Sequence, residues 1–315
     1  MMARATIAIH GGAGAIARSS METENALRYR QALTQIVASG QALLAAGGSA
    51  LDVVTEAVRQ LEECPLFNAG LGSVFTHQGT HELDACVMDG RTLDAGAVAG
   101  VSRVRNPVLA ARAVLENSPH LLFIGPGAES FAQENGLEMV DNDFFSTPER
   151  RAQLERAIAS DRTMLDHDGE PLDPERKFGT VGAVALDLAG NLAAATSTGG
   201  MTNKQAGRVG DTPLVGAGCY ASREVAVSCT GTGEVFMRTL AAYDIAAQMA
   251  YGGQTLAAAC DSVVLEKIPA LGGSGGVIAV DAEGNLALSF NSEGMYRGYG
   301  IVGELPVVAI YREEP

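Results

Sequence analysis

One threonine in this sequence is placed where it could act as a nucleophile. Thr180 follows Gly179 at the point where a charged segment gives way to an apolar one, in the stretch KFGTVGAVALDLAGNLAAATSTGG. A threonine hydroxyl is a poor nucleophile and needs a base beside it. If the chain is cut before Thr180, the freed α-amine has a pKa near ~8 and can serve as that base. One residue would then supply both nucleophile and base.

The same hydroxyl could also make the cut, by attacking the carbonyl of the preceding residue. Gly179 suits this step, because a residue without a Cβ can enter the strained backbone conformation that the attack requires. The charged segment before it could move away, while the apolar strand after it would hold Thr180 in place. By itself, however, a Gly-Thr pair before a strand is most often an ordinary turn, so the surrounding motifs have to decide.

Two further segments carry groups that suit an amino-acid substrate. In GRVGD, the planar guanidinium of Arg208 matches a carboxylate, and Asp211 can accept from an ammonium group. An amino acid presents both charges together, although an arbitrary Arg-x-x-Asp is usually a solvated surface pair. SCTGTGE (228–234) ends an apolar strand and opens a helix, where backbone N–H groups favour a developing negative charge. As a bare pattern, such a glycine loop is usually only a helix cap.

The elements before Thr180 are predicted to be both strands and helices. ATIAIHGGAGAI predicts a short strand that runs into a glycine loop, and residues 22–46 have helical apolar spacing. A second helix is expected after Ser49, which opens a capping box. Residues 66–104 predict two strands joined by a turn at Asp89-Gly90.

The first half is expected to end in a third helix and a charged linker. Asn106-Pro107 supplies an N-cap and a proline in the first turn of the third helix. Residues 141–177 are charged and predict a short helix followed by an exposed linker that ends at Phe178.

The second half contains two copies of one hairpin pattern. AVALDLAGNLAAAT predicts a strand, an Asp-x-x-Gly-Asn turn and a strand, and the pattern returns 94 residues later in GVIAVDAEGNLALSF. GEVFMRTLAAYDIAAQMAY and TLAAACDSVVLEKIPAL, which lie between them, are helical by length and spacing. Strands and helices therefore cluster separately, as expected for antiparallel sheets covered by helices.

Composition narrows the class of protein. The 315 residues, 47% of them hydrophobic, suit one large layered domain. The net charge of −15, without a lysine or arginine cluster, argues against nucleic acid or an anionic membrane as partner. No window approaches a membrane span, and the first apolar run is too short for a signal peptide. Five widely spaced cysteines predict reduced thiols and a cytoplasmic location.

Several long motifs in one order form a more specific signal than any dipeptide. They are HGGAGAI, LEECPLFNAGLGSVF, ELDACVMDG, GTVGAVALDLAGNLAAATSTGG, GRVGDTPLVGAGCYA and SCTGTGE. With them the chain resembles the plant-type L-asparaginase and isoaspartyl peptidase family of N-terminal nucleophile hydrolases, over nearly its whole length. The resemblance implies an α+β fold, a four-layer αββα sandwich in which helices cover two antiparallel sheets.

The resemblance also implies a precursor that cuts itself between Gly179 and Thr180. The products would be an α subunit, 1–179, with a mobile linker at about 158–179, and a β subunit, 180–315, which remain one structural domain. The family is typically a dimer of such cleaved αβ units. Its substrates are small molecules, L-asparagine and β-aspartyl dipeptides, from which L-aspartate is released.

The family motifs assign roles to individual residues. Thr180 matches the nucleophile, and Thr198 matches the second threonine that lies against it. Thr230 and Gly231 match the contacts to the oxyanion and the substrate. The substrate-binding set that the resemblance implies comprises Asn68, Arg208, Val209, Gly210, Asp211, Thr230, Gly231, Thr232 and Gly233.

No cofactor is expected for catalysis, but one loop resembles a sodium site. LEECPLFNAGL corresponds to a loop that wraps a structural sodium ion through backbone carbonyls, which is oxygen-ligand chemistry. The carbonyls implied are those of Leu61, Glu62, Cys64, Phe67, Ala69 and Leu71.

Other interpretations are weaker. Gly12-x-Gly14-x-x-Ala17 suits a dinucleotide fold, but no acidic residue lies about twenty positions beyond it. His77-x-x-x-His81 has zinc-like spacing, yet Gly79-Thr80 between them disfavours the helix that would align both rings. Two functional alternatives stay open: a glycosylasparaginase of the same fold, disfavoured without a signal peptide or paired cysteines, and a non-catalytic amino-acid-binding protein that never cuts itself.

Overall fold

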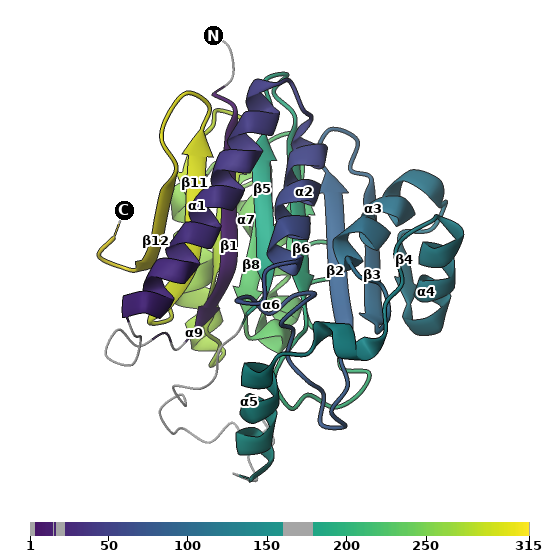
Figure 1. Cartoon of the computed structure of the whole chain (residues 1–315). Helices are drawn as coiled ribbons and strands as arrows, with labels where there is room; N and C mark the ends of the chain where they lie inside the picture. The colour runs from purple at the N-terminus through teal and green to yellow at the C-terminus, as the bar shows by residue number, and fades with distance from the viewer. Residues whose placement is uncertain (1–3, 15, 17–22, 160–178, 315) are drawn as a thin grey trace.

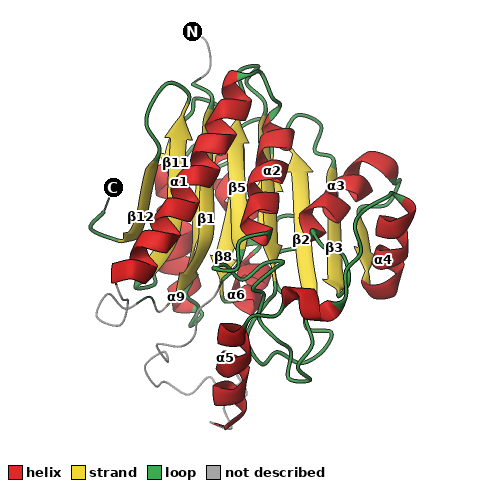
Figure 2. Ribbon diagram, in the orientation of Figure 1, coloured by secondary structure: helices red, strands yellow, loops and turns green. Residues whose placement is uncertain are grey.

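Two β-sheets lie at the centre of the molecule (Figure 1, Figure 2). The structure, a computed structural model, describes residues 4–14, 16, 23–159 and 179–314. The larger sheet has the spatial order β12 (Val307–Tyr311), β11 (Gly294–Ile301), β1 (Thr6–Gly14), β5 (Val181–Leu186), β6 (Leu192–Thr198), β2 (Leu83–Asp89), β3 (Ala95–Val101), β4 (Leu122–Ile124). The smaller sheet has the order β10 (Leu286–Ala287), β9 (Gly275–Asp281), β8 (Val225–Gly231), β7 (Cys219–Ala221). Neighbouring strands are antiparallel except β3 and β4, which are parallel.

Helices cover the outer face of each sheet. Against the larger sheet lie α1 (Thr23–Ala45), α2 (Ala50–Glu62), α3 (Pro107–Asn117) and α4 (Gly125–Glu134). Against the smaller sheet lie α6 (Gly233–Thr239), α7 (Ala241–Ala250), α8 (Leu256–Asp261), the π-helical segment η2 (Ser262–Lys267) and α9 (Ile268–Ala270). The 3-10 turn η1 (Asn142–Phe145) leads into α5 (Pro148–Ala159), which projects from one end of the sandwich in Figure 1.

Three apolar clusters fill the spaces between these layers. Ile7 and Ile9 of β1 pack with the helices outside the larger sheet, whereas Ala8 between them faces the second sheet. A third cluster, which includes Val227, joins the smaller sheet to its own helices. Because central strands such as β5 are buried on both faces, their sequences are continuously apolar instead of alternating. The predicted α+β fold, with two sheets and helices packed against them, is confirmed.

Local signals in the sequence correctly located several elements. The Ser49 hydroxyl accepts from the Asp52 N–H and caps α2 as predicted. Both hairpin copies form, β5–β6 in the larger sheet and β9–β10 in the smaller one. The predicted strands around Asp89-Gly90 are β2 and β3. The linker expected at about 158–179 lies, apart from its ends, outside the described residues.

Three local predictions were wrong in detail. The strand β1 does not end at its glycines but continues to Gly14 through a register shift between His10 and Ala13, where Gly12 has φ 107°. Asn106 precedes α3 but does not cap it with its side chain, since its amide donates to Glu63 instead.

The third error concerns two segments that were expected to be continuous helices. Residues 233–251 form two helices, because Leu240 between α6 and α7 has a left-handed backbone with φ 48°. Residues 255–271 are divided by η2, and Pro269 in α9 lacks the N–H that a regular helical ladder would need.

Candidate active site

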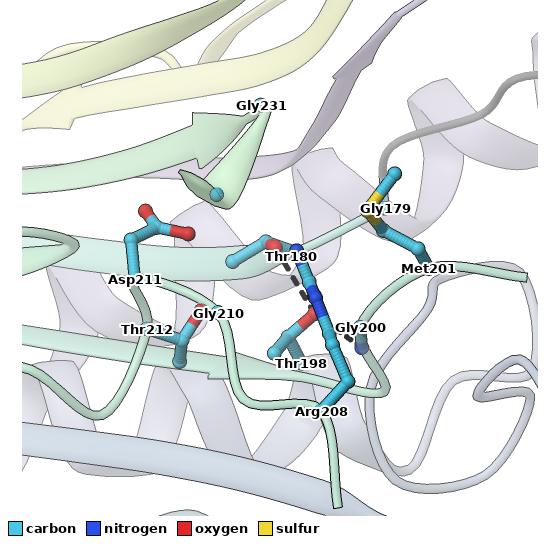
Figure 3. A pocket seen from close by; sticks show the side chains of 11 residues that line it. Gly179, Thr180, Thr198, Gly200, Met201, Arg208, Gly210, Asp211, Thr212 and Gly231 are labelled. Atoms are coloured by element: carbon cyan, nitrogen blue, oxygen red, sulfur yellow. Dashed lines mark hydrogen bonds between the residues drawn. The ribbon is translucent and has the colours of Figure 1, made fainter. Parts of the chain in front are cut away.

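Two threonines meet where β5 begins and β6 ends (Figure 3). The antiparallel register places Val181 opposite Ser197, so the residues just outside this pair, Thr180 and Thr198, also face each other. The Thr180 hydroxyl donates to the Thr198 hydroxyl oxygen at 3.0 Å, and that oxygen also accepts from the Gly200 N–H at 2.9 Å. Thr180 is 7% exposed, so its hydroxyl is held in place but still borders a pocket.

Gly179 is fixed by its contact with Asn68. A Cβ on Gly179 would lie 2.3 Å from the Asn68 Cβ, so only glycine fits there without a shift. Asn68 is fully buried; its amide donates to the Gly200 carbonyl, and its side-chain oxygen accepts from the Val74 N–H. The loop from the first half of the chain thus packs directly behind the Gly179-Thr180 bond, where Asn68 was expected.

The predicted pair Arg208 and Asp211 borders the same pocket. Both approach Gly233, where an added Cβ would lie 2.9 Å from Arg208 Nη2 and 3.1 Å from Asp211 Oδ1. The guanidinium is engaged by the Glu234 carboxylate through two hydrogen bonds of 2.9 Å. Arg208 therefore already makes the planar, two-bond contact that a substrate carboxylate would require.

Asp211 is the acidic residue of the pocket lining, and its pKa is shifted. It is 4% exposed, and burial raises the pKa of its carboxyl to about 7, while the nearby Arg208 cation opposes this rise. Among the described residues, neither Asp211 Oδ2 nor the hydroxyl of Thr212 has a hydrogen-bond partner. Buried polar atoms usually have partners, so these two indicate a place for a polar ligand.

The segment after β8 has the geometry of a tight strand-to-helix connection. Gly231 has φ 152°, and a Cβ there would lie 2.3 Å from the Ser274 carbonyl oxygen, so glycine is required. The Thr230 hydroxyl oxygen accepts from the Ala13 N–H at 3.4 Å, which leaves its own proton available for donation. The Thr232 N–H is occupied by the Ser274 carbonyl at 2.8 Å and cannot serve an oxyanion.

Most of the predicted site residues border one pocket. Its lining comprises Gly179, Thr180, Thr198, Gly200, Met201, Arg208, Gly210, Asp211, Thr212, Gly231 and Gly233 (Figure 3). Four predicted residues lie just outside this lining: Asn68, Val209, Thr230 and Thr232. Val209 belongs to the loop that joins Arg208 to Gly210. The residues of this lining, which extend from Gly179 to Gly233 in the chain, are therefore brought together by folding.

Gly200, Met201 and Thr212 border the pocket but were not assigned to the site from the sequence. Each lies in or next to a motif, since Gly200 ends TSTGG, Met201 follows it and Thr212 follows GRVGD. A methionine or threonine in a loop has no spacing that signals a ligand contact, so only their position next to the motifs could have indicated them.

Comparisons with known proteins identify the family of this chain. A family model described as asparaginase matches residues 3–310. This chain belongs to that asparaginase family. The expectation of an enzyme is therefore confirmed.

Curated relatives of this asparaginase-family chain span its length. It is 70% identical over 313 residues to an isoaspartyl peptidase of Salmonella typhimurium, an alignment that covers 99% of this chain and 100% of that protein. It is 68% identical over 314 residues to an isoaspartyl peptidase of Escherichia coli K12, with 99% and 98% covered. An isoaspartyl peptidase/L-asparaginase of Danio rerio is 43% identical over 288 residues, with 91% and 89% covered.

The loop predicted to bind sodium folds back on the end of α2. Within it, the Leu71 N–H donates to the Glu62 carbonyl at 2.8 Å, and the Phe67 N–H donates to the Cys64 carbonyl at 3.2 Å. The Cys64 N–H donates to the Leu61 carbonyl at 3.2 Å. A carbonyl oxygen has two lone pairs, so these bonds are compatible with a cation bound by the same oxygens.

The histidine pair with zinc-like spacing does not form a metal site in this asparaginase-family fold. His77 Nδ1 contacts the Asn203 side chain at 2.8 Å, whereas His81 bonds with Ser73 and Ser146. In the part of the chain that the structure describes, no group of three histidine, cysteine or acidic side chains could hold a metal ion. Nor does any described helix combine the length and the apolar character needed to cross a bilayer.

Proposed function

We propose that this enzyme hydrolyses β-aspartyl dipeptides and L-asparagine, with Thr180 as nucleophile, and releases L-aspartate. One observation carries the proposal: the Thr180 and Thr198 hydroxyls, 3.0 Å apart, share a pocket with Arg208 and Asp211. The names of the relatives, isoaspartyl peptidase and isoaspartyl peptidase/L-asparaginase, favour these substrates over a glycosylated asparagine.

Thr180 must first become an amino terminus. Its hydroxyl attacks the Gly179 carbonyl, and hydrolysis of the resulting ester frees the Thr180 amine. This amine, with a pKa near ~8, then takes the hydroxyl proton when Thr180 attacks the substrate carbonyl. Before the attack, Thr198 accepts a hydrogen bond from the same hydroxyl and orients it; the proton passes to the amine as the hydroxyl oxygen attacks.

The pocket holds the aspartyl end of the substrate by its two charges. Asp211 accepts from the α-ammonium group, and Arg208 donates to the α-carboxylate, with Glu234 sharing or releasing the guanidinium. The unpartnered oxygen of Asp211 supports this assignment. Because Asp211 has a pKa of about 7 without a ligand, a bound ammonium will favour its charged form and binding will release a proton near neutrality.

The remaining groups stabilise the intermediate. The Thr230 hydroxyl and the Gly231 N–H donate to the tetrahedral oxyanion, and Gly233 leaves room for the substrate beside Arg208. Ammonia or an amino acid leaves, and water then releases aspartate from the acyl-enzyme.

The mature protein would consist of two chains that stay associated. Residues 1–179 and 180–315 interleave in the larger sheet, where β5 and β6 lie between β1 and β2, so cleavage would not separate them. We further propose a dimer of these αβ units, a structural sodium ion held by the α2 loop, and no cofactor in catalysis. Five free cysteines support a location in the reducing cytoplasm.

The denatured mass of the purified protein, measured after incubation at neutral pH, tests self-cleavage. The expected result is two fragments, one that ends at Gly179 and one of 315 − 179 = 136 residues that starts at Thr180. An intact chain after long incubation would contradict the proposal and favour a protein that only binds amino acids.

A rate assay on the cleaved protein tests the substrate. Release of aspartate from a β-aspartyl dipeptide and from L-asparagine should be measured across pH 5 to 9, a range around the pKa of about 7 of Asp211. For the free enzyme, kcat/KM should rise as pH passes about 7, where Asp211 becomes charged, and should rise further up to ~8, where the Thr180 amine becomes neutral and can act as the base. Arg208→Ala should be cleaved normally but use both substrates poorly, since the chain's own cut needs no substrate carboxylate.

A further inference from the structure

A fully buried chain of polar side chains lies between the two sheets, outside the pocket lining. It comprises His10 of β1, Ser228 of β8 and Thr196 of β6, each 0% exposed. His10 Nε2 lies 2.9 Å from the Ser228 hydroxyl, which lies 2.7 Å from the Thr196 hydroxyl. At the other end, His10 Nδ1 lies 3.0 Å from the carbonyl oxygen of Thr180.

These contacts determine which nitrogen of His10 carries the proton. A carbonyl oxygen only accepts, so Nδ1 must be the donor to Thr180. Burial lowers the pKa of His10 to about 3, against a smaller opposing effect of the Thr180 hydrogen bond, so the ring is neutral and has one proton. Nε2 is therefore an acceptor, and the Ser228 hydroxyl donates to it. The single proton of the Thr196 hydroxyl is then shared between the Ser228 hydroxyl at 2.7 Å and the Gly218 carbonyl at 3.1 Å.

The sequence makes room for this arrangement at one glycine. Gly182 lies opposite His10 in the β1–β5 register. A Cβ on Gly182 would lie 1.9 Å from Ser228 Oγ and 2.5 Å from His10 Nε2. Any larger residue would break the contact between histidine and serine, so the glycine in GTVGAV has a definite function in the fold.

The anchored atom belongs to the residue that carries the chemistry. Thr180 lies one residue before β5, so its carbonyl is at the edge of the regular strand pairing. Once the bond to Gly179 is cut, the covalent restraint on the amino-terminal side of Thr180 is gone. The hydrogen bond from His10 remains as a restraint on its main chain.

We propose that His10 is a positioning residue, which anchors the main chain of Thr180 through its carbonyl and is held at its other ring nitrogen by Ser228. The inference rests on the proposed role of Thr180 as nucleophile. A displacement of about 1 Å at a reacting group can lower a rate by about 100-fold, so a lost anchor should affect kcat strongly. KM should change little, because the proposed substrate-binding residues Arg208 and Asp211 make no described hydrogen bond with His10.

The tautomer can be measured without any substrate. In protein with ¹⁵N-labelled histidine, long-range ¹H–¹⁵N spectra should show His10 protonated at Nδ1 only and unchanged between pH 5 and 8, well above its pKa of about 3. The resonances that disappear in His10→Asn identify the residue. A proton on Nε2, or a ring that titrates in this range, would overturn the proposal.

Three variants then test the effect on catalysis, with rates normalised to free Thr180 amino termini. His10→Leu removes both hydrogen bonds and should lower kcat by about 100-fold with KM within about twofold. His10→Asn keeps a nitrogen on Cγ that can donate to Thr180. Its kcat should be at least about tenfold higher than that of His10→Leu. Ser228→Ala removes the hydrogen bond that holds Nε2, and its kcat should fall between those of wild type and His10→Leu.

Two results would overturn the positioning role: a kcat of His10→Leu near wild type, or equal kcat values for His10→Leu and His10→Asn. If His10→Leu does not fold, His10→Gln replaces it, because its amide is displaced toward Ser228 and away from the Thr180 carbonyl. A wild-type enzyme that cleaves neither substrate would contradict the proposed function, whereas the measured tautomer would still decide whether the His10 anchor exists.

Discussion

The two hairpins with an Asp-x-x-Gly-Asn turn have nearly the same geometry but different surroundings. In the first, Asp187 Oδ1 accepts from the Ala189 and Asn191 N–H groups, each at 2.9 Å. In the second, Asp281 Oδ1 accepts from the equivalent groups of Glu283 and Asn285, also at 2.9 Å. The turns are therefore the same structure, formed by the same local sequence.

The strand ends of the two hairpins differ in chemistry. Seven residues before the turn aspartate stand Thr180 in the first hairpin and Ser274 in the second, and eleven residues after it stand Thr198 and Ser292. The threonines share a hydrogen bond, whereas the Ser292 hydroxyl donates to the Gly294 carbonyl. No hydrogen bond joins the two serines in the described structure.

Position in the sheet accounts for this difference. The first hairpin lies between β1 and β2, so neighbours on both sides restrain its ends, and the Asn68 carbonyl accepts from the Gly199 N–H just beyond Thr198. In the second hairpin β10 is an edge strand, and in the described part of the chain no further strand pairs with it on the side away from β9. A turn sequence specifies a hairpin, but the strands around it decide whether its ends can form a site.

The largest contrast is expected at the first position of each hairpin. Thr180→Ala should abolish both self-cleavage and substrate turnover, since it removes the proposed nucleophile. Ser274→Ala should cut itself normally and keep kcat within about twofold, because no described hydrogen bond involves the Ser274 hydroxyl. Mass spectra and aspartate release measure both. Self-cleavage of Thr180→Ala would disprove the assignment.

Substitutions at the second matched pair, Thr198 and Ser292, should differ less in their effect on kcat. Thr198→Ala leaves the Thr180 hydroxyl without its partner, so kcat should fall by about 100-fold. Thr198→Ser keeps the hydroxyl and should restore most of the rate. Ser292→Ala is the matched control and should match wild type. Equal kcat values for Thr198→Ala and Ser292→Ala would show that Thr198 has no part in catalysis.

Substitution of the two turn aspartates should lower the stability of the protein by different amounts. Asp187 Oδ2 also accepts from the Ala50 N–H at the start of α2, a contact that Asp281 has no equivalent for among the described hydrogen bonds. Asp187→Ala should therefore cost about 1 kcal/mol more than Asp281→Ala. Urea unfolding in a Thr180→Ala background measures this on an uncut chain, and equal losses would show that the α2 contact contributes nothing.

The turn glycines should show the smallest contrast. Gly190 and Gly284 have φ of 82° and 84°, so alanine should cost about 1 kcal/mol at either position. Around Gly284 an added Cβ would also lie 3.2 Å from the Arg4 carbonyl, whereas Gly190 is open. Gly284→Ala should thus be slightly the more destabilised in the same unfolding assay. A larger loss for Gly190→Ala would mean that the turns are not equivalent.

Sequence reasoning was most accurate where short-range hydrogen bonds determine the structure. The Ser49 cap and both aspartate turns depend on groups within a few residues, and each was located correctly. It was least accurate where packing competes with local preference, as at Leu240, where one expected helix becomes two. Helical spacing does not indicate where a helix must turn to stay on a sheet.

For the site, the motifs named most of the residues that border the pocket. They did not indicate His10, because a histidine in an apolar strand has no partner in its own vicinity. Its contacts, with Thr180 and Ser228, lie 170 and 218 residues away in the sequence. Nor did any sequence signal indicate the role of Gly182, whose missing side chain makes the histidine contact possible.

By itself, the sequence determined the turns and the helix cap, since these depend on neighbouring atoms of the same chain. Only the tertiary structure decided that one of two matching hairpins lies beside Arg208 and Asp211, and that His10 reaches the carbonyl of Thr180. The physical reason is that strand order and layer packing bring together groups far apart in the chain, and their hydrogen bonds form only after the sheets have assembled.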